Sequence, residues 1–185
     1  MSKPKTPTRT ELLEFANHTI PDLIAPDLKV LFCGINPSLY SAYTGHHFAR
    51  PGNRFWPALY GGGFSDTLLT PDQGAMLLAR GIGITNLVAR ATIAADELSM
   101  DELLTGGQGL VAKIQEYRPR TVAILGISAF RTAFNKPHSV LGSQQDILLP
   151  ASLWVLPNPS GLNAHYTPTE LSRIFGEFRQ AIAFN

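Results

Sequence analysis

Two apolar segments of the sequence end in the same polar tripeptide, Asn-Pro-Ser. The first tripeptide, at 36–38, follows LKVLFCGI (28–35), and the second, at 158–160, follows LWVLP (153–157). An asparagine side chain carries an acceptor oxygen and a donor nitrogen, so it can orient a water molecule or pair with the edge of a polar ring. Asn-Pro is also an ordinary turn signal. Two copies at the ends of two buried strands predict a shared site, because ligands bind beyond the carboxyl ends of parallel strands.

The segment 36–56, NPSLYSAYTGHHFARPGNRFW, is rich in aromatic residues for a solvent-exposed loop. The sequence contains neither G-x-x-x-x-G-K-[ST] nor G-x-G-x-x-G, the glycine-rich patterns that bind nucleotide phosphates. Aromatic faces beside exposed backbone amides suit a flat polar ring, such as a nucleobase that is stacked on one face and read at its edges. His46 and His47 are adjacent and point in different directions in an extended loop. No other ligands stand at the right spacing, so we expect no metal site.

The hydrophobic pattern predicts strands that alternate with helices. Near-continuous apolar runs predict four buried strands, at 28–35, 81–88, 121–126 and 153–157. This alternation is typical of an α/β fold, here a single three-layer domain at 10–185 with a central, mainly parallel sheet flanked by helices. Residues 1–9 are expected to be a flexible tail.

Six helices are expected between these strands and at the two ends of the chain. Four are predicted at 10–17 with Thr10 as its cap, and at 53–60, 71–80 and 127–134. A capping box of Ser99 with Glu102 opens a helix that runs towards Tyr117 and is interrupted at Gly106-Gly107. A second box, Thr167 with Glu170, opens the final helix.

Composition sets wider limits on function. The formal net charge of +1 is low for a protein that grips many phosphates by charge alone, so any DNA contact must be local. The single cysteine, Cys33, excludes an intramolecular disulfide and an all-cysteine zinc or iron–sulfur site. No apolar stretch is long enough to span a membrane, and no apolar signal core follows the N-terminal lysines. We therefore expect a soluble cytoplasmic protein, monomeric and without a cofactor.

The segments GINPSLYSAYTGHHFARPGNRFW (34–56) and LPNPSGL (156–162) together resemble the mismatch-specific (G·T/U) uracil/thymine DNA glycosylases of the uracil-DNA glycosylase superfamily. GITNLVARAT (83–92) and ADELS (95–99) fit the bacterial members, and the resemblance runs from about Leu28 onward. It implies a uracil-DNA glycosylase-like fold. It also implies a monofunctional, nucleoid-associated enzyme that hydrolyses the N-glycosidic bond of uracil, and of thymine or other modified bases, in double-stranded DNA with G·U or G·T mismatches.

The resemblance assigns roles to residues of the first motif. Asn36 corresponds to the residue that positions the water attacking the sugar C1′. A carboxamide cannot take the proton at pH 7, so such a site relies on stabilising the departing base. Phe48 corresponds to the aromatic residue that stacks on the base, and backbone amides near Ile35 and Phe48 are expected to hold the ring. Ser41, on the same loop, is a candidate for a contact to the base or its phosphate. Asn86 is expected to reach the base pocket, and Ser38 to contact the phosphate.

The second motif resembles the loop that enters the duplex. Leu162 corresponds to the wedge that fills the gap left by the extruded nucleotide. Backbone groups of Gly161 and Asn163 are expected at the widowed guanine, and Ala164 stands where close relatives carry arginine. The rest of the loop contributes Asn158, and Ser160 as a further contact to the backbone of the flipped nucleotide.

Several alternatives stay open on sequence alone. Asp96 could assist or replace Asn36 in activating water, or it could interact with the dipole of the helix capped by Ser99. The arginines near the motifs could contact phosphates or be surface charges: Arg50, Arg54 and Arg90. A mismatch-binding protein with little turnover is the alternative function. A serine hydrolase has little support because the sequence has no G-x-S-x-G elbow.

Overall fold

A computed structural model describes residues 6–145, 147 and 149–184 of the chain. Its centre is a five-stranded sheet in the order β2-β1-β3-β5-β4. Four strands are parallel: β1 (Val30–Gly34), β2 (Ile82–Asn86), β3 (Thr121–Leu125) and β5 (Ser152–Leu156). The short β4 (Gly142–Ser143) pairs antiparallel with β5. The predicted α/β fold with a mainly parallel sheet is confirmed. No observed parallel strand extends more than one residue beyond its predicted range.

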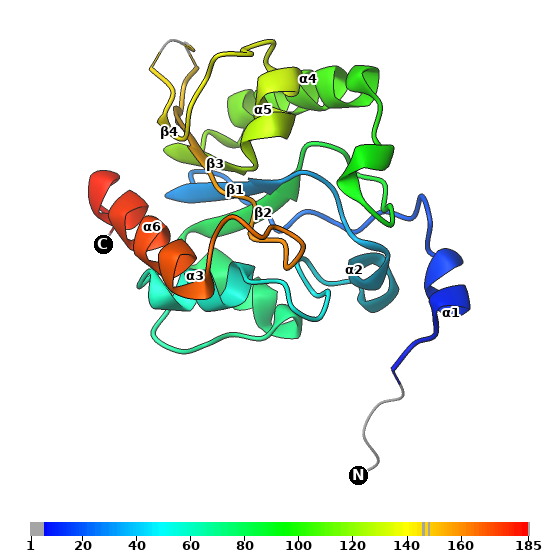
Figure 1. Cartoon of the computed structure of the whole chain (residues 1–185). Helices are drawn as coiled ribbons and strands as arrows, with labels where there is room; N and C mark the ends of the chain where they lie inside the picture. The colour runs from blue at the N-terminus through cyan, green and yellow to red at the C-terminus, as the bar shows by residue number, and fades with distance from the viewer. Residues whose placement is uncertain (1–5, 146, 148, 185) are drawn as a thin grey trace.

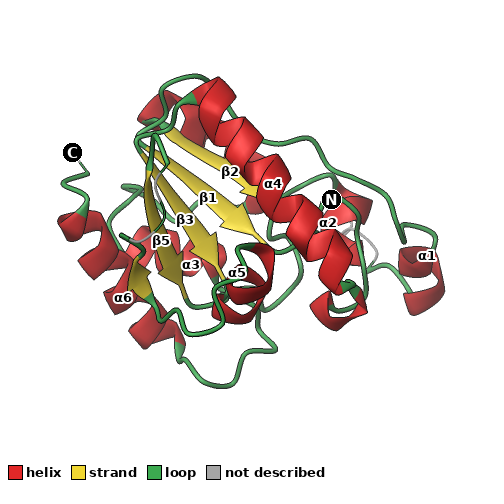
Figure 2. Ribbon diagram, turned by 90° about the horizontal axis from the view of Figure 1, so that it is seen from above, coloured by secondary structure: helices red, strands yellow, loops and turns green. Residues whose placement is uncertain are grey.

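Helices cover both faces of the sheet, which forms the middle of three layers (Figures 1 and 2). One face is covered by α3 (Phe55–Gly61), the 3₁₀ segment η1 (Pro71–Arg80) and α6 (Pro168–Ala181). The other face is covered by α4 (Met100–Tyr117) and α5 (Ile127–Ala133). Because both faces are buried, the strands need apolar residues at every position, and β1 and β3 are buried throughout.

The side chains of β1 alternate between two hydrophobic cores. Leu31 and Cys33 pack under α4 and α5. Phe32 points to the opposite face and lies at the centre of an aromatic cluster. Its ring contacts four phenylalanines at centroid distances of 5.4, 5.4, 5.7 and 6.1 Å, namely Phe55, Phe64, Phe175 and Phe178.

The N-terminal region differs from the prediction. Helix α1 is Arg9–Leu13, and its N-cap is Thr8 rather than Thr10. Thr8 is followed three residues later by Glu11, and the two form a reciprocal capping box, whereas position 13 is a leucine. Residues 1–5 of the predicted tail lie outside the described part of the chain.

Three further predictions of secondary structure need correction. Segment 71–80 is helical as predicted but has 3₁₀ geometry, and the predicted loop at 36–56 contains the helix α2 (Leu39–Thr44). Helix α4 is continuous through Gly106 and Gly107. Both glycines are buried: a Cβ at Gly106 would lie 2.5 Å from the carbonyl oxygen of Leu87, and one at Gly107 would clash with the backbone of α5. Close packing, not a helix break, explains the pair.

We expect Gly107→Ala to lower the free energy of unfolding by about 1–3 kcal/mol, because the added methyl group would push against the carbonyl of Ala133. Gly109, in the same helix, has open space around it and is the matched control. Gly109→Ala should raise the stability by about 0.5–1 kcal/mol, since alanine favours a helix over glycine. Urea unfolding followed by circular dichroism measures both, and equal effects of the two substitutions would contradict the packing explanation.

Candidate active site

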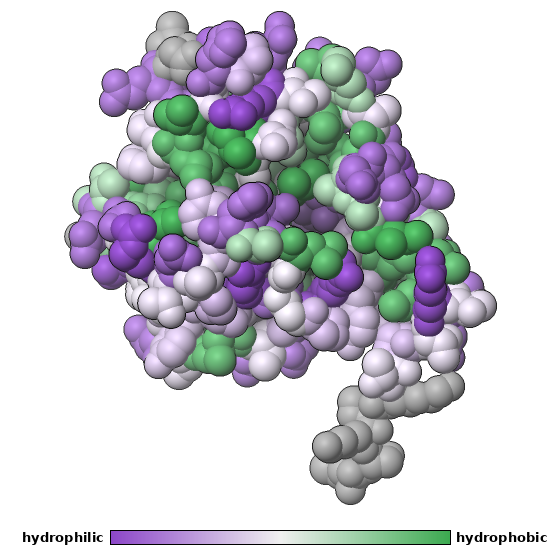
Figure 3. All heavy atoms as spheres, viewed as in Figure 1, coloured by the Kyte–Doolittle hydropathy of each residue, from purple (hydrophilic) through white to green (hydrophobic). Residues whose placement is uncertain are grey.

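A cavity of about 100 Å³ opens at the carboxyl edge of the parallel strands. It is smaller than the roughly 300–1,000 Å³ of pockets for drug-sized ligands, so it suits a single ring. Every parallel strand ends at it: β1 with Gly34, β2 with Asn86, β3 with Leu125, and β5 through Asn158 two residues beyond its end. Figure 3 shows a hollow near the middle of this face of the molecule. The predicted convergence of the two Asn-Pro-Ser motifs is confirmed, because both contribute to the lining.

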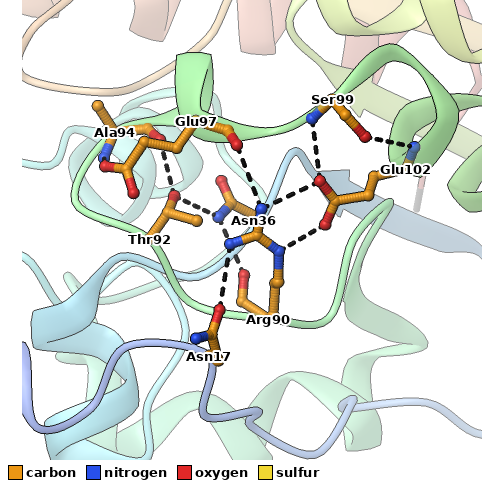
Figure 4. A network of polar contacts seen from close by, with 8 residues as sticks. All are labelled: Asn17, Asn36, Arg90, Thr92, Ala94, Glu97, Ser99 and Glu102. Atoms are coloured by element: carbon orange, nitrogen blue, oxygen red, sulfur yellow. Dashed lines mark hydrogen bonds and ion pairs between the residues drawn. The ribbon is translucent and has the colours of Figure 1, made fainter.

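The side chain of Asn36 is fixed in one orientation. Its amide nitrogen donates to the backbone oxygen of Arg90 at 3.0 Å and to Oγ1 of Thr92 at 2.7 Å (Figure 4). The Thr92 hydroxyl donates its own proton to the carbonyl oxygen of Ala94 at 2.7 Å, so it must accept from Asn36. Two acceptors therefore hold the amide nitrogen, and the acceptor oxygen of Asn36 is left for the pocket.

Phe48 forms a flat wall of the pocket. Its ring stacks on Phe55 of α3 at a centroid distance of 4.1 Å and an interplanar angle of 23°. Its backbone lies in the left-handed region, with φ at 54°, which is uncommon for a non-glycine residue. Gly34 leaves room beside the ring, because a Cβ there would lie 3.2 Å from it and would collide with Asn86. The packing of one face on Phe55 keeps the ring fixed for a stacking partner.

Ser38 and Ser41 both line the pocket, and both also organise the chain around it. Ser38 is the N-cap of α2 and accepts from the Ser41 amide at 3.1 Å. The buried hydroxyl oxygen of Ser41 accepts from the Ala49 amide at 3.1 Å, next to Phe48. The two hydroxyls are themselves 3.0 Å apart. These contacts tie α2 to the loop that carries the aromatic wall.

Asn86 and His47 form a second fixed polar pair. Ring nitrogen Nε2 of His47 lies 2.9 Å from the backbone oxygen of Pro21, and a carbonyl only accepts, so Nε2 carries the proton. The other nitrogen, Nδ1, then accepts, and the Asn86 amide nitrogen faces it at 3.5 Å. This leaves the Asn86 oxygen directed towards Gly34 and the pocket. Burial lowers the pKa of His47, which keeps the ring neutral.

The loop after β5 is a tight turn that its own side chains close. The Asn158 side-chain oxygen accepts from the Ser160 amide at 3.0 Å, and Oγ of Ser160 accepts from the Leu162 amide at 3.3 Å. At the tip of this turn, Leu162 is 67% exposed. Gly161 lies against the Gly52 turn, because a Cβ there would be 2.5 Å from the Gly52 oxygen. An exposed leucine on a turn that is closed by its own hydrogen bonds is compatible with the predicted wedge role of Leu162.

Arg54 fastens this loop to α3, a role that the sequence did not reveal. Its guanidinium donates to three backbone oxygens of the loop, those of Ser160, Tyr166 and Asn163, the last at 2.6 Å. The Arg54 amide also donates to the oxygen of Pro159 at 2.9 Å. Arg54 is therefore neither a solvated surface charge nor free to contact a phosphate. It is part-buried, and its guanidinium holds the loop in place.

Two predicted roles are not supported by the geometry. The backbone amide of Asn163 donates to Ser160 at 2.9 Å and its oxygen accepts from Arg54, so its backbone groups are engaged within the protein rather than offered to a guanine. Asp96 is exposed in a 3₁₀ turn just before α4 and does not line the pocket. The structure does not bring it together with Asn36, and its position before the N-terminus of α4 fits the helix-dipole interpretation.

The other candidate residues lie behind the pocket, at its rim or in its lining. Arg90 is ion-paired with Glu102 behind Asn36. Arg50 is exposed at the rim of the pocket, where it faces open solvent. The rim also carries Ile93, which is 50% exposed and was not identified from the sequence. Ile35 lines the pocket as predicted.

We also searched the described residues for a metal site, a reactive thiol and a membrane-spanning helix. Within residues 6–145, 147 and 149–184, no three histidine, cysteine, aspartate or glutamate side chains are arranged as metal ligands. Burial raises the pKa of the Cys33 thiol far above its ordinary value, so this residue stays protonated and is a poor nucleophile. Among the described helices, none has both the length and the apolar character needed to cross a bilayer.

Comparison with known families agrees with this geometry. The sequence model of the Uracil DNA glycosylase superfamily matches residues 21–181. The chain belongs to this superfamily. The match covers all four parallel strands and both Asn-Pro-Ser motifs, and it supports a DNA glycosylase role for the pocket.

A solved structure has the same superfamily fold. It is the solution NMR structure of a Methanosarcina acetivorans protein proposed to be a uracil DNA glycosylase. The TM-score is 0.56, with 16% sequence identity, and the match covers 88% of this chain and 98% of that one. At this identity the likeness shows the fold alone.

Arg54→Lys should loosen the loop that carries Leu162, because a lysine has no planar fork to hold three carbonyls at once. We expect faster hydrogen exchange of the Asn163 and His165 amides and a loss of about 1.5–3 kcal/mol in unfolding free energy. Arg50→Lys, at the exposed rim, is the control and should change neither. If the Asn163 and His165 amides of Arg54→Lys exchange at the wild-type rate, the guanidinium of Arg54 does not hold the loop.

The lowered pKa of His47 predicts a pH-dependent stability. The unfolded chain binds a proton at this residue near pH 6.5, whereas the folded chain does so only at lower pH. The contribution is therefore complete above pH 6.5 and is lost as the pH falls towards the folded-state pKa. His47→Gln should remove that part of the pH dependence, as measured by wild-type minus variant unfolding free energies from pH 4 to 8, roughly. A difference that stays constant over this range would rule out the assignment.

Proposed function

We propose that the protein is a monofunctional DNA glycosylase that flips uracil out of G·U mismatches and hydrolyses its N-glycosidic bond. The observation that carries the proposal is the side chain of Asn36, which lines a ring-sized cavity and whose amide nitrogen is held by two acceptors of the protein. Thymine in G·T mismatches and other modified bases are further candidate substrates of the same pocket.

The pocket has the features that a flipped uracil needs. Phe48, held from behind by Phe55, offers a flat face for stacking. The Asn86 oxygen offers an acceptor to the ring N–H of uracil, which cytosine lacks at that position. Ile35 and Phe48 line the pocket, and we assign to backbone amides near them the stabilisation of the negative charge on the departing base.

The mechanism that follows is dissociative. The Asn36 oxygen accepts a hydrogen bond from water and aims it at C1′, but it does not remove the proton. The bond to the base therefore breaks first, giving an oxocarbenium-like sugar and a uracil anion that preorganised donors stabilise. The water then forms the bond to C1′, and its proton passes to the uracil anion or to solvent. The lining residues that the structure describes include no lysine, so no amine is available for a Schiff base and strand cleavage.

DNA engagement is assigned to the rim of the pocket. Leu162 enters the duplex in place of the flipped nucleotide, and Ser38 and Ser160 contact its phosphates. Arg50 supplies a positive charge beside them. The backbone oxygen of Asn163 accepts from Arg54, and position 164 is an alanine, so neither residue is assigned a contact to the widowed guanine. The backbone of Gly161 is then the one contact that we assign to this guanine. We therefore expect only a modest preference for G·U over A·U.

The decisive test is single-turnover release of base from duplexes with G·U, A·U and G·T pairs and from single-stranded uracil DNA. Asn36→Ala should slow release from G·U by at least about 100-fold while DNA binding persists, because the water loses its orientation. Release at the wild-type rate in Asn36→Ala would move the catalytic role elsewhere. Mismatch binding by the wild type without any release would favour a mismatch-binding protein with little turnover.

Leu162→Ala should weaken binding to a G·U duplex by about 1–3 kcal/mol, since the gap in the base stack would be left unfilled. Leu68→Ala is the matched control, because Leu68 is 55% exposed but does not line the pocket. Fluorescence anisotropy with a G·U duplex and with single-stranded DNA measures both effects. An equal loss on the two DNAs would contradict the wedge role, since single strands have no stack to fill.

A further inference from the structure

Arg90 lies outside the pocket lining, yet its guanidinium makes four hydrogen bonds just behind Asn36. Its guanidinium donates to both carboxylate oxygens of Glu102, from Nε at 2.5 Å and from Nη2 at 3.0 Å. It also donates to the backbone oxygen of Glu97 and to the side-chain oxygen of Asn17, each at 3.2 Å. Figure 4 shows these contacts around one guanidinium. Such a set of bonds fixes the Arg90 side chain from three parts of the chain.

The backbone of the same residue holds the Asn36 amide. The Arg90 carbonyl is one of the two acceptors for the Asn36 nitrogen, and Thr92 provides the other. Backbone hydrogen bonds anchor the segment that follows, because Ala91 pairs with 17–18 and the Thr92 amide donates to Pro37. The Ala91 N–H shares a peptide plane with the Arg90 carbonyl, and the chain before Arg90 is held by the Val88 amide, which donates to Ile35 at 2.9 Å. The bonds of the Arg90 side chain to Asn17, Glu97 and Glu102 add the side-chain support of this residue.

Glu102 is itself rigidly placed. It occupies the third position of α4 and closes a capping box, accepting from the Ser99 amide at 2.9 Å while its own amide donates to the Ser99 hydroxyl at 3.2 Å. The hydrogen bond from Arg90 lowers the pKa of Glu102 to about 2, and the Ser99 amide acts in the same direction. The carboxylate is therefore charged wherever the protein is folded at ordinary pH.

We propose that Glu102 is a positioning residue for Asn36 and acts through Arg90. The proposal rests on the glycosylase function above and extends it to a residue on α4 that touches neither the base nor the water. A rotated Asn36 amide would place its oxygen against the Arg90 carbonyl, where two acceptors repel. The position of that carbonyl thus decides where the Asn36 oxygen points, and misplacing a reacting group by about 1 Å can cost 100-fold in rate.

The test uses Glu102→Gln, which keeps a good residue for the capping box and removes the charge that holds Arg90. We expect single-turnover release from G·U to fall by about 10- to 100-fold, with an unchanged dissociation constant for the duplex. Glu170→Gln is the matched control, because Glu170 closes the same kind of capping box with Thr167 at the start of α6. That variant should keep the wild-type rate.

A second readout does not depend on activity. Both side-chain N–H groups of Asn36 are hydrogen-bonded in the wild type, so their exchange with solvent, followed by ¹⁵N NMR, should be slow. Exchange should accelerate in Glu102→Gln and in Arg90→Lys, whose circular dichroism verifies folding, and stay slow in Glu170→Gln. If the wild type releases no base, the proposed function fails while this readout still judges Glu102. A wild-type rate together with slow Asn36 exchange in Glu102→Gln would overturn the positioning role.

Discussion

The structure depends on the parallel pairing of β1 between β2 and β3. Val30 of β1 is in register with Ile82 on one side and Thr121 on the other, so the three strands end at one edge. β5 extends the same alignment from β3. The connections that leave β1 and β3 lead in opposite directions along the sheet, which opens a crevice at that edge. Segments that are more than a hundred residues apart in the chain meet there for this reason.

The side chain of Asn36, at the carboxyl edge of the sheet, must be held in one orientation if it is to position a water molecule. An amide has almost no basicity at neutral pH, so in the proposed mechanism Asn36 contributes only through the position and direction of its oxygen. The protein meets this demand with acceptors alone, Arg90 and Thr92, which leave one orientation of the amide without repulsion. In the proposed mechanism, the supports of these acceptors, at α4 and at the turn after β2, matter as much as the pocket itself.

The same logic applies to the loop that carries Leu162. An exposed apolar side chain has value as a wedge only if the backbone beneath it is stiff. Asn158 and Ser160 close the turn from within, and Arg54 fastens it to α3. Three carbonyl oxygens that would otherwise need water are thereby satisfied in the free protein. The loop is thus organised in the free protein, so in the proposed role little ordering entropy would oppose its binding to DNA.

Much of this could be predicted from the sequence, and the failures have physical causes. Four apolar runs identified the parallel strands because a sheet covered on both faces needs apolar residues throughout. The roles of Thr92 and Arg54 could not be predicted, since their hydrogen bonds join residues 56 and 106 positions apart. For Asp96 the sequence left open a catalytic role and an interaction with the helix dipole, because the geometry of a short 3₁₀ turn, which keeps Asp96 out of the pocket lining, could not be predicted.

The most direct test of the central claim is a crystal structure with a duplex that carries 2′-fluoro-2′-deoxyuridine opposite guanine. The fluorine disfavours the oxocarbenium-like state, so the uncleaved complex should persist. We predict a flipped uracil stacked on Phe48, a water between the Asn36 oxygen and C1′, and Leu162 in the base stack. A uracil that stays in the duplex, or a flipped one whose C1′ is remote from Asn36, would contradict the account.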